Sequence, residues 1–247
     1  MKIGIIPDIH TKIDRAESII HYLYGNLGVH GIVFLGDYVD DFNDDVRTMV
    51  RTLLKVGEWQ SNYNNIMLLG NHEANYMHPK MKCVGWTKEK QEMWDLFNGL
   101  DFKVTGLGTH YMVYPETHGE KGPSVLFTHA GLPAGLNVNK QTADLYRFIT
   151  EGVYKDSLDY HVYDGGEHAT GSIITARNKR TPYEKKYRQI FGHTPSDKPQ
   201  ITFGDNGKWL HVGLDTNLNH FGVMMTDSQD LTIYEVDKFK LYMNLAG

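Results

Sequence analysis

The 247-residue chain has a single cysteine, no long apolar run and no excess of positive charge. With Cys83 alone, an intrachain disulfide and a zinc site built from several thiolates are both excluded. No segment approaches the roughly 18 consecutive apolar residues of a membrane-spanning helix, and the N-terminal apolar run is too short for a signal peptide. The net charge of -5 provides no basic field for nucleic acid or an anionic membrane. We therefore expect a soluble, cytoplasmic protein that does not bind membranes.

Length and composition predict a single folded domain over residues 1–247. Hydrophobic residues make up 40% of the chain and charged residues 22%, which is ordinary for a globular protein. This length spans one large domain or two small ones, and we favour one because no linker interrupts the motifs described below. Residues 154–171 show no clear period, and we expect them to form a lid or loop over the site.

Apolar runs that alternate with helical patterns mark the first part of the chain. Residues 2–6, 31–35 and 65–69 are predicted strands; Asp14 is available to cap the first helix, and Asn43 or Asp44 the second. This alternation predicts a parallel sheet covered on both faces. The later predicted strands favour a second, largely antiparallel sheet packed on the first; they are residues 109–114, 124–128, 188–192, 208–214, 221–226 and 231–236.

Five short polar motifs each follow a predicted strand. They are Pro7-Asp8-Ile9-His10, Gly36-Asp37-Tyr38-Val39-Asp40, Gly70-Asn71-His72-Glu73, Thr128-His129-Ala130-Gly131 and Phe191-Gly192-His193-Thr194. In parallel sheets, ligands bind beyond the carboxyl ends of the strands. We therefore expect Asp8, Asp37 and Asn71 to converge on one crevice.

The side chains of these motifs suit a two-metal site. Carboxylate, imidazole and amide oxygen are ligands for Mn, Fe, Zn or Mg. Two metals about 3.5 to 4 Å apart can share a carboxylate, generate hydroxide and clamp an in-line displacement at phosphorus, and Asp37 is the best bridging residue. A leaving alkoxide also needs a proton, which His72 is placed to donate, with Asp40 as its carboxylate partner; such general acid catalysis contributes about 10²- to 10⁴-fold.

Taken together, the five motifs resemble the calcineurin-like metallophosphoesterase superfamily, and especially its serine/threonine phosphoprotein phosphatase branch, with its bacterial and phage members and the dinucleoside tetraphosphatases. The resemblance implies an α/β fold in which two mixed sheets pack face to face between helices. It also implies two divalent metal ions, with Mn favoured and Fe, Zn, Ni or Mg as alternatives. The positions that match the family's motifs place Asp8, His10 and bridging Asp37 on the first metal, Asp37, Asn71, His129 and His193 on the second, His72 as proton donor, and Asp40 as the residue that orients it.

Two positions depart from the family pattern. Asp41 stands where the phosphoprotein phosphatases carry a phosphate-gripping arginine, and Pro195 stands where other members carry a second histidine. Arg177 lies where related bacterial enzymes have a phosphate-binding arginine, and a bidentate grip by Arg177 would replace the lost one. The alternative is that Arg177 belongs to a solvated basic face with Lys179 and Arg180.

The expected function is therefore hydrolysis of phosphomonoesters by attack of a metal-bound hydroxide, as in a serine/threonine-type protein phosphatase or a broad-specificity phosphatase. One alternative is a hydrolase of dinucleoside polyphosphates or nucleic-acid phosphates, which the missing arginine favours; no basic stripe with interleaved aromatics supports a long nucleic-acid footprint. A second alternative is a non-catalytic scaffold of the same fold, although none of the six expected ligands is missing. The partner is then a phosphorylated substrate, and the sequence leaves the oligomeric state open.

Overall fold

The computed structural model describes residues 1–41, 44–61, 64–77, 83–98, 111–114, 125–137, 147, 173–176 and 182–247. Its helices and strands are β1 (Lys2–Ile6), α1 (Ile13–Gly25), β2 (Gly31–Phe34), α2 (Val46–Gln60), β3 (Ile66–Met67), α3 (Asn71–Met77), α4 (Lys88–Asn98), β4 (Tyr111–Tyr114), β5 (Val125–Thr128), β6 (Arg188–Phe191), β7 (Gln200–Phe203), β8 (Trp209–Gly213), β9 (His220–Met225), β10 (Leu231–Glu235), the 3-10 helix η1 (Val236–Lys238) and β11 (Lys240–Leu245). The expected loop at 154–171 and Arg177 both lie outside the described residues.

The first sheet has the strand order β11-β10-β9-β1-β2-β3. Its β1, β2 and β3 are parallel, as the alternating apolar runs predict. β9 pairs antiparallel with β1, with Met224 opposite Ile3, and β10 and β11 continue the sheet from there. The expectation that the C-terminal strands belong to a second sheet is therefore wrong. They extend the first sheet because β9 pairs with the side of β1 that β2 leaves open.

The second sheet has the order β4-β5-β6-β8-β7 and is mixed rather than largely antiparallel. Its central strands β5, β6 and β8 are parallel, and the two edge strands β4 and β7 run antiparallel to their neighbours. Two edge strands of the molecule, β7 and β11, were not anticipated. Both are largely exposed and carry polar residues among apolar ones, so they lack the apolar runs that mark buried strands.

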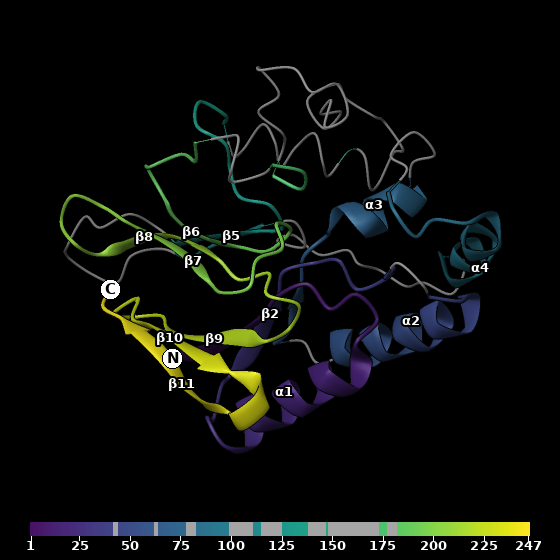
Figure 1. Ribbon diagram of the computed structural model, residues 1–247, viewed down its shortest axis with the longest axis horizontal. Helices are drawn as coiled ribbons and strands as arrows, with labels where there is room; N and C mark the ends of the chain where they lie inside the picture. The colour runs from purple at the N-terminus through teal and green to yellow at the C-terminus, as the bar shows by residue number, and fades with distance from the viewer. Residues whose placement is uncertain are drawn as a thin grey trace.

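Two apolar layers hold the fold together. One lies between the sheets and contains Ile5 and Val33 of the first sheet with Phe127 and Val212 of the second. The other lies between the first sheet and its helices, where Ile19 of α1 and Val56 of α2 meet side chains of the sheet. Figure 1 shows α1 and α2 on one side of the first sheet and the second sheet on its other side. The predicted fold class, two mixed sheets face to face with flanking helices, is confirmed.

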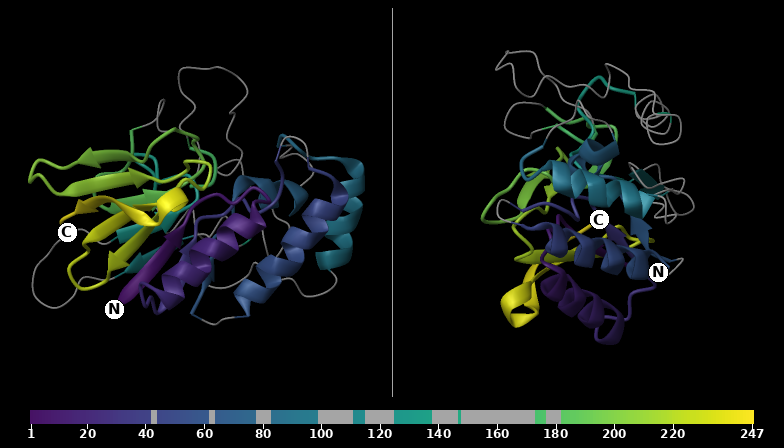
Figure 2. Two further views of the ribbon diagram at one scale, coloured as in Figure 1. Left: turned by 60° about the horizontal axis from the view of Figure 1, so that its bottom comes forward. Right: turned by 90° about the vertical axis from the view of Figure 1, so that its right-hand side faces the viewer.

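Helix caps differ from the expected ones by one or two residues. Lys12 occupies the N-cap of α1 without a side-chain bond, and Asp14 lies in the first turn instead. Asp45 caps α2 by accepting the N–H of Thr48 at 2.7 Å. Asp44, one of the two expected caps, instead accepts bonds from loops at the site, described below, and Asn43, the other, lies outside the described residues. Helix α4 lies alongside α2, as Figure 2 shows.

None of the described helices has the length and hydrophobicity that a bilayer crossing requires.

Candidate metal centre

The five motifs converge at the strand ends of both sheets. Asp8 follows β1, Asp37 follows β2 and Asn71 opens α3, while His129 follows β5 and His193 follows β6. They surround a pocket of about 310 Å³. Six of the predicted site residues line it, namely His10, Asp37, Asp40, Asn71, His72 and His193.

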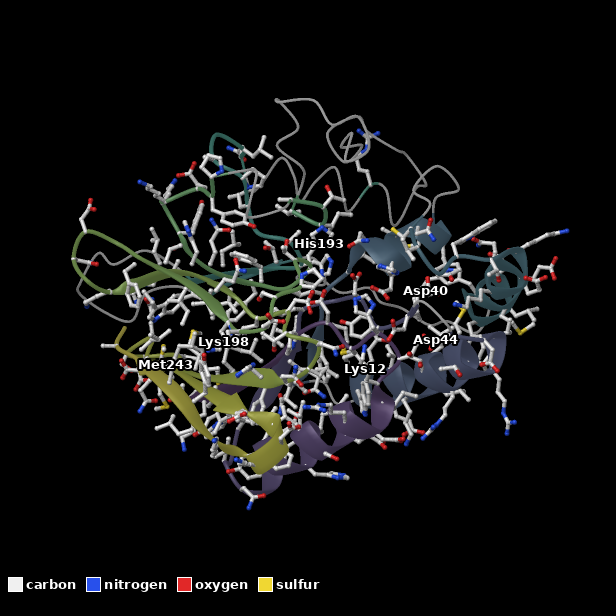
Figure 3. All side chains as sticks on the ribbon, viewed as in Figure 1. Lys12, Asp40, Asp44, His193, Lys198 and Met243 are labelled. Carbon is white, nitrogen blue, oxygen red and sulfur yellow. The ribbon has the colours of Figure 1, made fainter. Side chains whose placement is uncertain are left out.

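Two further predicted residues, Asp8 and His129, are almost fully buried and lie beside this pocket. In Figure 3, the labelled Lys12, Asp40 and His193 surround the same region, between the strands and α3. The structure therefore brings together all the predicted site residues except Arg177, which is not described.

The carboxylate of Asp37 stands at the centre of the site. Its Oδ2 lies 3.3 Å from Nε2 of His129 and 3.8 Å from Nε2 of His10, on opposite halves of the site. Ligand atoms of Asp37, His10 and His72 form one compact group, and those of Asp37, His129 and His193 form another. Burial would raise the pKa of Asp37, but the surrounding imidazoles, His129 first, hold it well below its usual range. Asp37 is thus an ionised carboxylate shared by two potential cation sites.

Around His129, atoms that accept hydrogen bonds converge on one point. Its Nδ1 donates to the carbonyl of Leu35 at 2.8 Å, which leaves Nε2 of a neutral ring as an acceptor. That Nε2 lies 2.9 Å from Oδ1 of Asn71 and 3.2 Å from Nδ1 of His193. Burial opposes a proton on His129, yet the negative charge of Asp37 raises its pKa to about 10. Either a proton or a metal cation satisfies this arrangement, and the donor set of nitrogen and oxygen atoms fits a divalent metal.

The other half of the site is built around Asp8 and His10. Nδ1 of His10 donates to the carbonyl of Asp40 at 2.7 Å, so its Nε2 points into the pocket. Oδ2 of Asp8 accepts the backbone N–H of His193 at 2.9 Å, whereas Oδ1 is buried without a hydrogen-bond partner among the described residues. Burial, and then the charge of Asp215, raise the pKa of Asp8. A buried carboxylate oxygen without a donor is the environment that a metal ion satisfies.

Several site residues adopt the left-handed backbone conformation. His10, Asp37, Asp40 and His193 have φ angles of 41°, 50°, 62° and 67°. This region is uncommon for residues other than glycine and costs roughly 1 to 3 kcal/mol each. Gly192 serves a related purpose, because a Cβ there would collide with Oδ1 of Asp8. Backbone strain is therefore present where the loops turn these side chains toward the pocket.

Glu73 offsets part of this strain by holding the loop that carries Asp37. Its Oε2 accepts the N–H groups of Asp37 at 3.0 Å and Gly70 at 3.1 Å. Its Oε1 accepts those of Tyr38 at 2.8 Å and Val39 at 3.2 Å. Of these four amides, that of Gly70 stands at the start of α3, and the other three belong to the neighbouring loop. Burial, followed by the charge of Asp37, raises the pKa of Glu73 to about 7.

His72 and Asp40 face each other beside this loop. Nδ1 of His72 lies 3.6 Å from Oδ2 of Asp40, and Nε2 lies 3.9 Å from Oδ2 of Asp37. Burial alone would lower the pKa of His72, but these carboxylates outweigh it and raise that pKa. The predicted pairing of His72 with Asp40 therefore matches the geometry.

Three residues near the pocket were not identified from the sequence. Asp215 is buried and lines the pocket. It comes just after the largely apolar strand β8, and a polar residue in that position is the same sequence signal that predicts Asp8 and Asp37. Lys12 also lines the pocket and pairs with Asp41 at 3.1 Å. Cys83 accepts the Nδ2 of Asn71 at 3.1 Å, which turns the amide oxygen toward His129. No sequence pattern marks Lys12 or Cys83 for these positions.

Comparison with known proteins adds evidence of two kinds. A family model for calcineurin-like phosphoesterases matches residues 1–209. No curated protein sequence matches the chain significantly. Among solved structures, the chain resembles a cold-active protein tyrosine phosphatase at 13% identity and a TM-score of 0.60, covering 99% of this chain and 78% of the other. It likewise resembles the cold-active protein-tyrosine phosphatase of a psychrophilic Shewanella species at 15% identity and a TM-score of 0.57, covering 99% and 80%. At these identities, the structural likeness shows a shared fold.

Proposed function

Because the chain belongs to the calcineurin-like phosphoesterase family, it is a metal-dependent phosphoric ester hydrolase, and we propose that it hydrolyses phosphomonoesters at a two-metal centre. The observation that supports two metals is the position of Asp37, whose carboxylate belongs to both compact groups of ligand atoms. The substrate class that we propose is that of a serine/threonine-type protein phosphatase or a broad-specificity phosphatase, because the motifs most resemble that branch of the family.

The proposed ligands divide between the two halves of the site. Asp8, His10 and Asp37 would hold one ion, and Asp37, Asn71, His129 and His193 the other. When bound, such ions supply Lewis-acid chemistry, which offsets charge on the phosphoryl oxygens and acidifies the attacking water. Asp215 adds a third carboxylate near Asp8 and so increases the attraction of this site for cations. The protein's own task is to hold these side chains in place, which Glu73 and Cys83 assist.

His72 is the proposed proton donor to the leaving oxygen. By distance alone, its Nε2 could act as a ligand beside His10 and Asp37. The carboxylate of Asp40 on its other nitrogen favours the protonated ring, however, and a protonated imidazole has no lone pair for a metal. In this arrangement Nδ1 is held by Asp40 and Nε2 delivers the proton into the pocket.

Lys12 and Arg177 are the proposed contacts to the substrate phosphate. Asp41 replaces the arginine of the phosphoprotein phosphatases, and its Oδ2 holds Lys12 at the pocket wall. Asp44 stabilises this wall by accepting the N–H of Asp41 and the hydroxyl of Thr11, both at 2.6 Å. A lysine provides a point charge rather than a bidentate grip, so binding of the phosphate would depend less on its orientation.

Hydrolysis of p-nitrophenyl phosphate tests the proposed activity. We expect Mn²⁺ to stimulate it, and Asp37→Asn to remove most of it together with stoichiometric metal binding. His72→Asn should keep the metals but lose about 10²-fold or more of the rate with an alkyl phosphate, whose leaving group needs the proton. His21→Asn, an exposed histidine of α1, is the matched control. A wild-type protein that binds two metals per chain but hydrolyses no ester would be a scaffold, contrary to the proposal.

A panel of substrates distinguishes hydrolysis of phosphomonoesters from the second candidate function. The replacement of the family arginine by Asp41 favours hydrolysis of a dinucleoside polyphosphate or of a nucleic-acid phosphate over that of a phosphoprotein. Comparing kcat/KM for a phosphothreonine peptide, a dinucleoside tetraphosphate and a phosphodiester ranks these classes. The phosphomonoester proposal expects the phosphothreonine peptide to be hydrolysed fastest, and a higher kcat/KM for either of the others would contradict it.

A further inference from the structure

A lysine is buried behind the candidate site. Lys90 of α4 is only 2% exposed, although lysine is almost never fully buried unless it is paired. Its Nζ donates to Oδ1 of Asp40 and to the carbonyl of Gly85, each at 2.9 Å. Helix α4 lies alongside α2 (Figure 2). Lys90 therefore belongs to an element outside the five motifs, and it contacts the site through Asp40. The established family motifs give this lysine no role.

Among the described residues, two side chains donate hydrogen bonds to Asp40, and both bonds fall on the same oxygen. Besides Lys90, the hydroxyl of Tyr76 donates to Oδ1 at 2.8 Å. The ring of Tyr76 is itself held by stacking on Trp94, with ring centroids 5.1 Å apart. Two donors on Oδ1 fix the rotation of the carboxylate about its Cβ–Cγ bond. The other oxygen, Oδ2, therefore stays turned toward His72.

The Asp40 and His72 atoms that face each other are both buried. Oδ2 of Asp40 and Nδ1 of His72 are 3.6 Å apart, and within the described part of the chain neither makes a hydrogen bond. Buried polar atoms favour pairing, and here each is the nearest means of satisfying the other. The backbone is adapted to the same arrangement, because Gly85 has a φ of +92° and any Cβ there would lie 2.9 Å from Cβ of Asp40. Loop 83–87 can thus approach Asp40 and present the Gly85 carbonyl to Lys90.

We propose that Lys90, assisted by Tyr76, is a positioning residue for the reaction: it holds Oδ1 of Asp40 so that Oδ2 keeps His72 oriented to protonate the leaving group. This inference rests on the proposed phosphatase function and adds to it a residue from a separate helix. Lys90 also supplies the positive charge that a fully buried carboxylate requires. Without the ammonium group, the Asp40 side chain is free to rotate away from His72.

A merely structural lysine would behave differently in a leaving-group experiment. If Lys90 only ties α4 to the loop that carries Asp40, its loss lowers stability and slows all substrates equally. If it acts through the proton donor, the loss is large for an alkyl phosphate, whose alkoxide must be protonated. It is small for p-nitrophenyl phosphate, whose phenolate leaves readily without a proton.

The test uses the 247-residue chain loaded with Mn²⁺ and the variant Lys90→Met, which keeps an unbranched, slightly shorter side chain and removes its charge. For glycerol phosphate we expect kcat to fall roughly 10-fold or more, and for p-nitrophenyl phosphate less than about threefold, with KM and metal content unchanged. Lys88→Met is the matched control, since Lys88 is on the same helix, 84% exposed and paired only with Glu92 among the described residues. It should match wild type on both substrates.

A double-mutant cycle completes the test. In the His72→Asn background, Lys90→Met should cost no further activity toward glycerol phosphate, because residues that act as one unit are not additive. Equal losses on both substrates, full additivity in the cycle, or wild-type kinetics in Lys90→Met would each overturn the role of Lys90.

A second variant keeps the proposal testable if Lys90→Met does not fold. Tyr76→Phe removes one hydroxyl from Oδ1 of Asp40 and retains the stacked ring, and it should show the same bias toward the alkyl ester with a smaller loss. A Tyr76→Phe protein with wild-type kinetics on both substrates would overturn the proposal. A wild-type protein that hydrolyses neither ester would overturn the proposed function itself, and this inference with it. The two failures are therefore distinguishable.

Discussion

Replacing Glu73 with glutamine should show how strongly the site loop depends on one carboxylate. The two oxygens of Glu73 accept four backbone N–H groups, and the side chain is only 1% exposed, so water does not substitute for them. Glutamine keeps the shape but has one acceptor oxygen. Two of the four amide groups would then face an NH₂ group that can only donate.

The expected destabilisation follows from those two bonds. A hydrogen bond to a charged group contributes about 1.5 to 3 kcal/mol, so two of them give about 3 to 6 kcal/mol. Glutamine is neutral and avoids the cost of burying a charge, the same cost that raises the pKa of Glu73 to about 7. We therefore take the lower end, about 3 kcal/mol, which is a large part of a typical stability of about 5 to 15 kcal/mol. For a chain of this length, the corresponding fall in Tm is about 6 to 12 °C.

Urea denaturation followed by circular dichroism measures this loss directly. A chelator should be present, because metal bound to the folded state would add stability. The midpoint should fall while the slope m stays the same. Glu92→Gln is the matched control: Glu92 is an exposed glutamate paired with Lys88, and the change should stay within about 0.5 kcal/mol. The reasoning is refuted if Glu73→Gln is also within about 0.5 kcal/mol of wild type.

Three further predictions concern the metals, the substrate and pH. Asp215→Asn should weaken divalent metal binding by roughly 10-fold, which is the effect of losing a residue that supports the direct metal ligands. An unchanged affinity in a calorimetric titration would exclude Asp215 from the site. Lys12→Met and Arg177→Ala should each raise KM for phosphate esters with metal content unchanged; a variant with the wild-type KM would remove that residue from substrate binding. Burial lowers the pKa of His211 in the folded chain. As the pH falls, the unfolded chain therefore binds a proton at this residue before the folded chain does, and stability should fall as the pH drops through about 6.5, the pKa of an unperturbed histidine. In His211→Gln, urea midpoints between about pH 8 and pH 5.5 should decline less steeply than in wild type.

Much of the candidate site was predictable because its signals are local. A buried strand is recognisable as a short apolar run, and a polar residue directly after it must lie at the end of the sheet. Asp8, Asp37 and His193 satisfy this rule, and the structure brings them together. Asp215 satisfies it as well and was overlooked because it belongs to no recognised motif. The family match confirms the reaction class that these motifs predict.

The distribution of strands between the two sheets was not predictable in the same way. Each strand from β8 to β10 was expected close to its observed place, but β9 and β10 belong to the first sheet rather than the second. The pairing of β9 with β1 joins segments more than 200 residues apart, with Lys2 opposite Met225. An apolar pattern records that a strand is buried, not which neighbour completes its hydrogen bonds.

The sequence by itself therefore determined the family, its phosphate-ester chemistry and the position of polar side chains at strand ends, because side-chain chemistry and local periodicity are properties of short segments. Only the tertiary structure decided which side chains support that site. In the sequence, Lys90 is one of several charged residues of a polar helix, and Asp41 indicates only that the arginine of the phosphoprotein phosphatases is absent. Their contacts with Asp40 and Lys12 join segments distant in the chain, and at Lys90 burial turns an ordinary charge into a specific partner.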